Sequence, residues 1–163
     1  MHSLSPQQAL TIRLHKLGFL LDKAADTCLQ SHVQFGLSQF RILAMLRQDS
    51  NCSQIHIAEL LDQTEAAISR QINLMVKEGL VMRVTKPTNR RERVLSLTDE
   101  GQRRLEAGWQ ALQELQHETF ENVNETEKQA LSDLAEKLGW RLHRYLEVHG
   151  HPIQHHKVTE RKD

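Results

Sequence analysis

Apolar residues recur at helical spacing along most of the chain. Near the N-terminus they return every three or four positions, which predicts one long helix over residues 6–30. Pro6 follows Ser5, and proline is favoured in the first helical turn. The apolar stripe consists of Leu10, Leu14, Leu17, Leu21, Ala24 and Cys28. A helix of this length exposes more apolar surface than one short neighbour can cover.

Three shorter helices are predicted next, each with a polar N-cap that accepts a hydrogen bond from a free N–H group of the first turn. The predicted caps are Ser38, Ser53 and Thr64. Gly79 is placed to end the third helix in the left-handed conformation that glycine favours. The predicted buried residues are Phe40, Ile42, Leu43 and Leu46, then Ile55, Ala58 and Leu61, then Ala67, Ile68, Ile72, Met75 and Val76.

The periodicity changes after the third of these helices. Residues 81–85 and 93–97 are rich in valine and leucine, which predicts two β-strands. The residues between them, 86–92, are polar and include Arg90 and Arg91. We therefore expect a β-hairpin with a long basic loop at its tip.

Two more helices complete the pattern. Thr98 is placed to cap the first, whose stripe includes Trp109. The spacing of Asn124 and Glu127 resembles a capping box for the second, whose apolar face is formed by Leu131, Leu134, Leu138, Leu142 and Tyr145. The fold class is therefore mainly α with a small β-hairpin, in the element order of a winged helix-turn-helix flanked by further helices.

The helix that follows Thr64 has an outer face suited to the major groove of DNA. Its outward residues are small or polar, and a slim face lets a helix approach base edges. We expect Ala66 and Ala67 to contact thymine methyl groups and Ser69 and Asn73 to hydrogen-bond to bases. Arg70 is placed to reach a guanine edge or a phosphate.

Helix N-termini and the hairpin add candidate backbone contacts. The N–H groups of a first helical turn bind phosphate, and arginines at a hairpin tip enter the minor groove or contact the backbone. The complete predicted DNA-binding set is Ser38, Ser53, Thr64, Ala66, Ala67, Ser69, Arg70, Asn73, Lys77, Arg90, Arg91 and Arg93.

Four stretches in this order resemble transcriptional regulators of the MarR family. They are QIHIAELL at 54–61, TEAAISR at 64–70, KEGLV at 77–81 and NRRERVLSLTDEG at 89–101. The family wing usually contains Asp-x-Arg-Arg, whereas here Thr88 and Asn89 precede the two arginines, so the acidic residue is absent. The resemblance covers residues 10–147.

The resemblance implies a triangular homodimer that binds palindromic double-stranded DNA, commonly as a repressor. The first helix and the last two helices of each subunit would interlock. The large apolar stripes on these helices agree with a dimer. We accordingly divide a MarR-type domain, 6–147, into a winged-helix core at 36–98 with its helix-turn-helix at 53–76, dimerisation helices at 6–31 and 99–147, and a polar, histidine-rich tail at 148–163.

The resemblance also implies a small-molecule effector that enters the crevice between the dimerisation and DNA-binding parts. His15 and Trp109 are the candidate residues for this pocket, although core or dimer packing is the simpler role for Trp109. The expected function is thus a ligand-responsive, sequence-specific regulator without a cofactor. Motifs for a catalytic nucleophile, a phosphate loop or paired acid–base carboxylates do not stand out, so we expect no enzyme.

A metal- or thiol-responsive regulator is the alternative. Cys28 falls on an apolar stripe, as a buried structural thiol does. Cys52 precedes a helix N-terminus that could lower its pKa, although an inert loop thiol is the favoured interpretation. The histidines crowded near the C-terminus, His143, His149, His151, His155 and His156, lack standard metal-ligand spacing, and no metal site is predicted. A protein-interaction adaptor that has lost DNA binding is a further alternative.

Composition excludes several classes of protein. The 163 residues are 39% hydrophobic and 26% charged, which is typical of a globular chain and not of a disordered one. Two cysteines cannot staple a disulfide scaffold and are expected to be reduced in the cytoplasm. No run approaches the ~18 apolar residues that a membrane helix requires.

The distribution of charge changes the meaning of the total. The net charge of +0 seems to exclude a nucleic-acid partner. However, residues 64–98 carry seven basic and three acidic side chains, whereas residues 99–139 carry four basic and ten acidic ones. With a Debye length of ~8 Å, distant acidic helices are largely screened from the DNA-facing side. Neutrality therefore does not exclude DNA.

Overall fold

The computed structural model describes residues 4–49, 52–86 and 89–150, with the backbone alone over the strand residues within 85–93. In these residues the elements follow one another as α1 (Pro6–Val33), α2 (Leu37–Gln48), α3 (Gln54–Leu60), α4 (Glu65–Lys77), β1 (Val81–Lys86), β2 (Asn89–Leu97), α5 (Asp99–Phe120) and α6 (Glu125–Val148). The mainly helical class with one antiparallel hairpin is confirmed.

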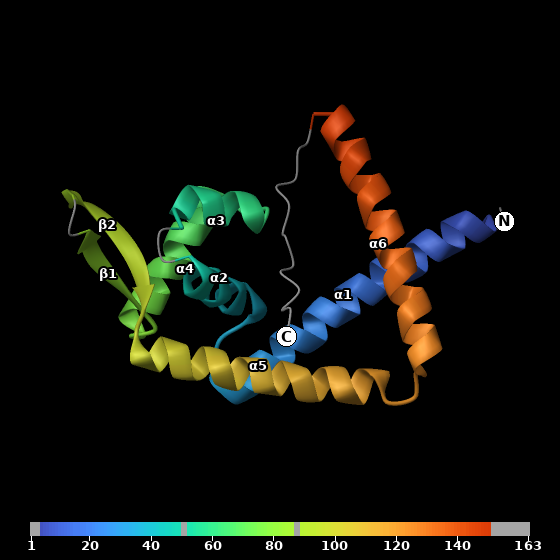
Figure 1. Ribbon diagram of the computed structural model, residues 1–163, viewed down its shortest axis with the longest axis horizontal. Coiled ribbons are helices and arrows are strands. Elements are labelled where there is room, and N and C mark those ends of the chain that lie inside the picture. The colour runs from blue at the N-terminus through green and yellow to red at the C-terminus, as the bar shows by residue number, and fades with distance from the viewer. Residues whose placement is uncertain (1–3, 50–51, 87–88, 151–163) are drawn as a thin grey trace.

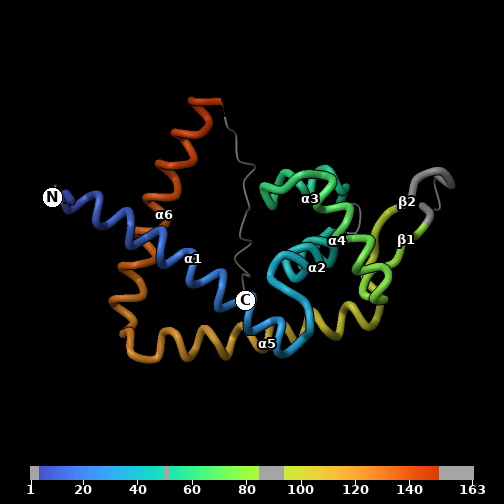
Figure 2. Tube along the Cα trace, turned by 180° about the vertical axis from the view of Figure 1, so that it is seen from behind, coloured from blue at the N-terminus to red at the C-terminus, as the bar shows by residue number. Residues whose placement is uncertain are grey.

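The elements form a compact group with two long arms. Figure 1 shows α2, α3 and α4 gathered beside the hairpin, with α5 running past them toward α6. Both views place α6 and the N-terminal half of α1 at the end of the molecule away from the hairpin (Figure 2). None of the described helices combines the length and apolar character needed to cross a membrane.

Local capping explains where most helices begin. The Ser53 hydroxyl accepts from the His56 N–H at 3.1 Å, and the Thr64 hydroxyl accepts from the Ala67 N–H at 3.2 Å. Asn124 forms the predicted capping box at the start of α6. These bonds satisfy N–H groups that have no partner within the helix.

The predicted cap of α2 is wrong. The helix begins at Leu37 after Gly36, and Ser38 lies inside its first turn. The cap comes from α1 instead, because the Leu37 N–H donates to Asp26 Oδ1 at 2.8 Å. A tertiary contact thus supplies what the local sequence seemed to assign to Ser38.

The hairpin also differs from its prediction. Residues 86–92 were expected to form a loop, but β2 begins at Asn89, so Arg90 and Arg91 are part of a strand. Lys86 pairs with Asn89 while Thr85 pairs with Arg93, with an irregularity in register between the two positions on β1. The extra residues are accommodated on β2, as in a β-bulge, which lets pairing continue past the expected strand end.

The hydrophobic core holds the three short helices against the adjoining ends of α1 and α5. Leu29 of α1, Phe35, Ile42 of α2, Ile57 of α3 and Leu105 of α5 are almost fully buried. Ion pairs at the surface of this group join Arg41 to Asp22 at 2.8 Å and Arg47 to Glu106 at 2.7 Å. The core therefore fixes α2, α3 and α4 relative to the two long helices.

The arms are exposed in the single subunit. In α1 every described residue up to Ala24 is exposed or only partly covered, and α6 contains no buried residue. The exposed apolar residues of these arms include Leu10, Leu14, Leu17, Leu21, Leu131, Leu134, Leu138, Leu142 and Tyr145. The predicted stripes are present and remain largely exposed within the described residues.

A tight junction joins the hairpin to α5. The Thr98 N–H donates to the Leu80 carbonyl at 3.1 Å, and the Thr98 hydroxyl accepts from the Gly101 N–H at 3.0 Å. Gly101 packs so closely that a Cβ atom there would overlap the Leu80 carbonyl oxygen. Only glycine allows α5 to leave the hairpin at this distance.

We expect Gly101→Ala to lower the free energy of unfolding by about 2 kcal/mol, in the range for overpacking against backbone that cannot yield. The measurement is urea denaturation followed by circular dichroism. Gly139→Ala is the matched control, because a Cβ at Gly139 meets no atom within 4 Å. An undiminished stability of the Gly101 variant would contradict the close contact.

Candidate nucleic-acid interface

Helix α4 divides sharply into a buried and an exposed face. Ile68, Ile72 and Met75 are 0% exposed and belong to the core. The opposite stripe carries Ala66, Arg70, Asn73 and Lys77, all exposed, at the spacing of three and four that places residues on one helix face. Thr64 is exposed at the N-cap, while Ala67 and Ser69 are half-buried at the edges of the stripe. The predicted residues of this helix are therefore brought together on one surface.

Arg83 is a candidate interface residue that the sequence patterns did not reveal. It lies on β1, and its guanidinium donates to Asn73 Oδ1 at 2.5 Å. The contact leaves the Asn73 amide nitrogen as the donor toward a base, while the Arg83 fork retains further N–H groups. It also joins the hairpin to the outer face of α4. No local spacing places residues 73 and 83 opposite each other, because the pairing depends on the turn at Gly79.

The other predicted contacts have different outcomes. Arg90, Arg91 and Arg93 lie in β2, but their side chains are outside the part of the chain that is described. The Ser38 hydroxyl accepts from Gln63 Nε2 at 2.9 Å. Since the first N–H of α2 already donates to Asp26, that helix end is occupied by a carboxylate.

The winged-helix segment matches a known family. The family model described as "MarR family" matches residues 36–92. The match spans about a third of the chain, and over these residues the chain is similar to the MarR family. This confirms the resemblance read from the sequence, on the same short helices and hairpin.

A regulator from Bacillus subtilis (strain 168), described as the uncharacterized HTH-type transcriptional regulator YdgJ, is 28% identical over 105 residues. The match covers 63% of this chain and 64% of that protein, which is less than two thirds of its length. It carries the name of a regulator and not of an enzyme, in agreement with the expectation from the sequence.

Solved MarR-family structures share the fold at low identity. A cysteine-to-serine mutant of MarR from E. coli, complexed with operator DNA, aligns with a TM-score of 0.65 and 23% identity over 82% of this chain and 99% of that chain. CouR from Rhodococcus jostii RHA1, bound to p-coumaroyl-CoA, aligns with a TM-score of 0.68 and 18% identity over 83% and 95%.

The two residues predicted for an effector pocket lie apart. Trp109 packs edge-on against Phe40, with ring centroids 4.9 Å apart, which agrees with its packing role. His15 lies in the exposed half of α1, whereas α1 meets α5 near Cys28, whose sulfur is 3.4 Å from the Ala111 carbonyl oxygen. At 1.5 Å per residue, His15 is about 20 Å along the helix from that crossing.

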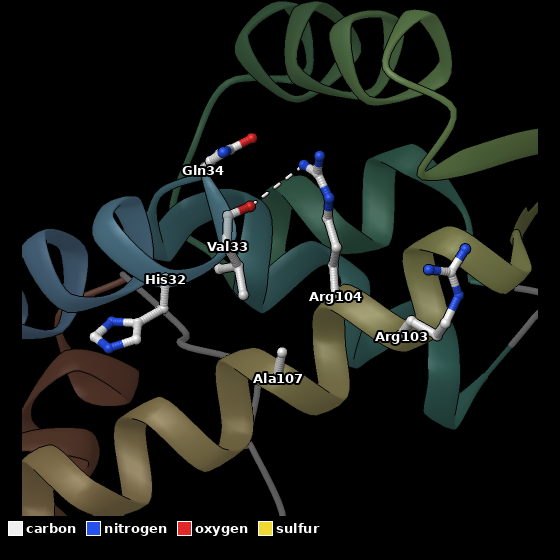
Figure 3. Close-up of a pocket in the computed structure, with 6 residues that line it drawn as sticks. All are labelled: His32, Val33, Gln34, Arg103, Arg104 and Ala107. Carbon is white, nitrogen blue, oxygen red and sulfur yellow. Dashed lines mark hydrogen bonds between the residues drawn. The ribbon is translucent and has the colours of Figure 1, made fainter.

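Two cavities instead lie between α1 and α5 of the MarR-type fold. One, of about 300 Å³, is lined by His32, Val33, Gln34, Arg103, Arg104 and Ala107. Figure 3 shows Arg104 reaching across to the Val33 carbonyl, to which it donates at 3.3 Å. Arg103 and Arg104 both pair with Glu100, at 2.6 and 2.9 Å.

The second cavity is more apolar. It has a volume of about 460 Å³ and is lined by Leu20, Lys23, Ala24, Thr27, Cys28, Ser31, His32 and Leu115. Neither cavity includes His15 or Trp109. The two predicted pocket residues therefore do not meet around a shared space within one subunit.

The thiols lack the low pKa of reactive cysteines. Burial raises the pKa of Cys52, and Asp49 adds to the effect, so the suggestion that the helix N-terminus lowers it is wrong. Burial first, then Glu114 and Glu118, raises the pKa of the Cys28 thiol. Burial disfavours the thiolate at both sites.

Histidines do not form a metal site in the described ranges. No group of three or more metal-ligating side chains occurs there. His149 stacks on Tyr145 with ring centroids 4.0 Å apart. His151, His155 and His156 fall outside the described residues.

We expect iodoacetamide to alkylate Cys28 and Cys52 more slowly in the folded protein than in urea at neutral pH. A raised pKa lowers the thiolate fraction at any given pH, so the rate should continue to climb above pH 9.0, the ordinary value for a thiol. Mass spectrometry of Cys28→Ser and Cys52→Ser variants assigns each rate. Rapid alkylation at neutral pH at either site would contradict the stated directions.

Proposed function

We propose that this chain is a homodimeric, ligand-responsive transcriptional repressor that binds a palindromic operator in double-stranded DNA. The observation that carries the proposal is the exposed stripe of Ala66, Arg70, Asn73 and Lys77 on α4, held outward by the buried face of the same helix. The E. coli MarR mutant with a similar fold was solved with operator DNA, which supports the same partner here.

The geometry suggests how bases would be read. The small side chains of Ala66 and Ala67 let α4 approach the floor of the major groove. Arg70 is then placed for a bidentate contact with guanine, and Asn73, held by Arg83, for a hydrogen bond to a base. The hairpin arginines Arg90, Arg91 and Arg93, together with Ser53, are proposed to contact the flanking backbone.

A dimer follows from the exposed arms. Apolar stripes along the N-terminal half of α1 and along α6 remain uncovered in one subunit, and burying such surface is the main driving force for association. Two recognition helices related by a twofold axis would enter major grooves about one helical turn, ~34 Å, apart. Domain boundaries at 36–98 for DNA binding and at 6–31 and 99–147 for dimerisation are part of this proposal.

The effector is proposed to bind between α1 and α5. CouR, which has a similar fold, was solved with p-coumaroyl-CoA, so this fold accommodates an anionic ligand. In the cavity of Figure 3, Arg103 and Arg104 share the single carboxylate of Glu100. An anionic ligand would compete with Glu100 for these guanidinium groups. Arg104 also donates a hydrogen bond to the last turn of α1. Displacing Arg104 would remove this bond and loosen the junction between the arms and the winged helix.

The direct experiment selects a duplex from a random DNA library with the wild-type protein and measures affinity by fluorescence anisotropy at fixed salt. We expect Arg70→Ala to cost about 1–3 kcal/mol on the selected duplex and little on a scrambled one. Arg83→Ala should also weaken binding to the selected duplex, by less than Arg70→Ala does, because the substitution removes the hydrogen bond that holds the Asn73 side chain. Arg141→Ala, on α6, is the control. Failure of the wild-type protein to enrich any sequence would overturn the proposed function.

The dimer is tested separately. Leu138→Glu places a charge on the apolar stripe of α6, and we expect it to yield monomers in sedimentation velocity and to weaken binding to the selected duplex by more than tenfold. Gln129→Glu, on the opposite face of α6, is the matched control and should remain dimeric. A Leu138 variant that sediments like the wild-type dimer would show that this face lies outside the interface.

A further inference from the structure

A chain of side-chain hydrogen bonds runs between α2 and α4. Gln63, in the turn before α4, donates through Nε2 to Ser38 Oγ at 2.9 Å and accepts through Oε1 from Gln71 Nε2 at 2.8 Å. Ser38 belongs to α2 and Gln71 to α4, and all three side chains are half-buried. We name these residues the glutamine relay. Bonds between two side chains are a small minority of protein hydrogen bonds, and two in series are rarer still.

The central glutamine is held rigidly by its own backbone. Its N–H donates to the Ala58 carbonyl at 2.9 Å, which ties the turn to α3. The residue before it, Asp62, has φ 50°, in the left-handed region. The residue after it, Thr64, caps α4. The backbone is therefore fixed before and after Gln63, which restricts the positions that the side-chain amide of Gln63 can reach.

Gln71 depends on this relay for its hydrogen bonding. Its Oε1 atom is buried and accepts no hydrogen bond from the described residues, so the bond from Nε2 to Gln63 anchors the amide. A half-buried amide that loses its partner leaves a donor unsatisfied, which is costly in a low-dielectric environment. The relay therefore favours one rotational position of α4 about its own axis over slightly different rotational positions.

This rotation decides where the exposed stripe points. Gln71 follows Arg70 directly and precedes Asn73 by two positions, so a turn of α4 about its axis moves all three together. The apolar contacts of Ile68, Ile72 and Met75 hold α4 to the core but are non-directional. Hydrogen bonds restrict both distance and angle, and they supply the directional restraint that apolar packing lacks.

We propose that Ser38, Gln63 and Gln71 are positioning residues that set the orientation of α4 and thereby its discrimination between DNA sequences. The proposal rests on the proposed function. It assigns to Ser38 a role inside the protein, as a hydrogen-bond acceptor for Gln63, in place of the phosphate contact expected from the sequence. Base contacts require exact geometry, whereas phosphate contacts tolerate small tilts. Loss of the relay should therefore reduce specificity more than general affinity.

The test measures the ratio of affinities for the selected duplex and for a scrambled duplex of the same length. We expect Gln63→Ala to lower this ratio about tenfold, equivalent to ~1.4 kcal/mol, with little change on the scrambled duplex. Ser38→Ala added to Gln63→Ala should cause no further loss, because residues that act as one network are not additive. Gln102→Ala is the matched control, since it removes a glutamine bond to Glu106 on α5, at 2.9 Å.

A conservative variant separates positioning from folding. In Gln63→Glu the carboxylate accepts from both the Ser38 hydroxyl and the Gln71 amide. We therefore expect the ratio of affinities to stay within about threefold of the wild-type ratio. Thermal unfolding of each variant shows whether it is folded. If Gln63→Ala folds poorly, the affinity ratio of the Ser38→Ala single variant tests the relay instead.

Each outcome has a distinct meaning. A wild-type protein without preference for the selected duplex overturns the proposed function itself. If the wild-type protein is selective and its Gln63 and Ser38 variants keep the full ratio of affinities, the proposed positioning role of the relay is overturned. Equal losses on both duplexes also overturn it, because they indicate a structural role without effect on specificity.

Discussion

The burial of one face of α4 is the constraint on which the rest of the molecule depends. Ile68, Ile72 and Met75 are wholly removed from solvent, and each such side chain contributes on the order of 2 kcal/mol of transfer free energy. Once that face is fixed in the core, the stripe with Arg70 and Asn73 has to point outward. The hairpin then follows from the same helix, because Gly79, at φ 71°, turns the chain so that β1 returns beside α4 and Arg83 meets Asn73.

The same core connects this surface to the long helices. Leu80, at the start of the hairpin, receives the Thr98 N–H and lies against Gly101, so the hairpin and α5 move as one body. Arg104 and Asp26 tie the end of α1 to α5 and α2. Acidic residues outnumber basic ones over 99–139, in α5 and the first part of α6, whereas basic residues outnumber acidic ones over 64–98, in α4 and the strands. From its start at the hairpin, α5 runs away from it toward α6 (Figure 1). A neutral chain can thus carry a positive surface at one end.

Local patterns were enough to predict the elements and the outward face of α4. The caps Ser53, Thr64 and Asn124 lie where the sequence placed them, because capping acts within four residues. The features that local patterns did not predict depend on tertiary contacts. The cap of α2 comes from Asp26, eleven residues before Leu37 in the sequence. The Gln63 side chain bridges α2 and α4, a role that no local spacing predicts. Burial, which no local spacing reveals, raises the pKa of Cys52, in the direction opposite to the one that a helix N-terminus alone would give.

The central claim is that two copies of α4 occupy neighbouring major grooves of one palindrome. Hydroxyl-radical footprinting of the wild-type protein on the selected duplex, combined with methylation protection of guanine N7, tests it most directly. The predicted result is a pattern symmetric about one centre, with N7 protection in two major-groove segments about one helical turn, ~34 Å, apart. A single unsymmetrical block, or uniform backbone protection without protected N7 atoms, would contradict it.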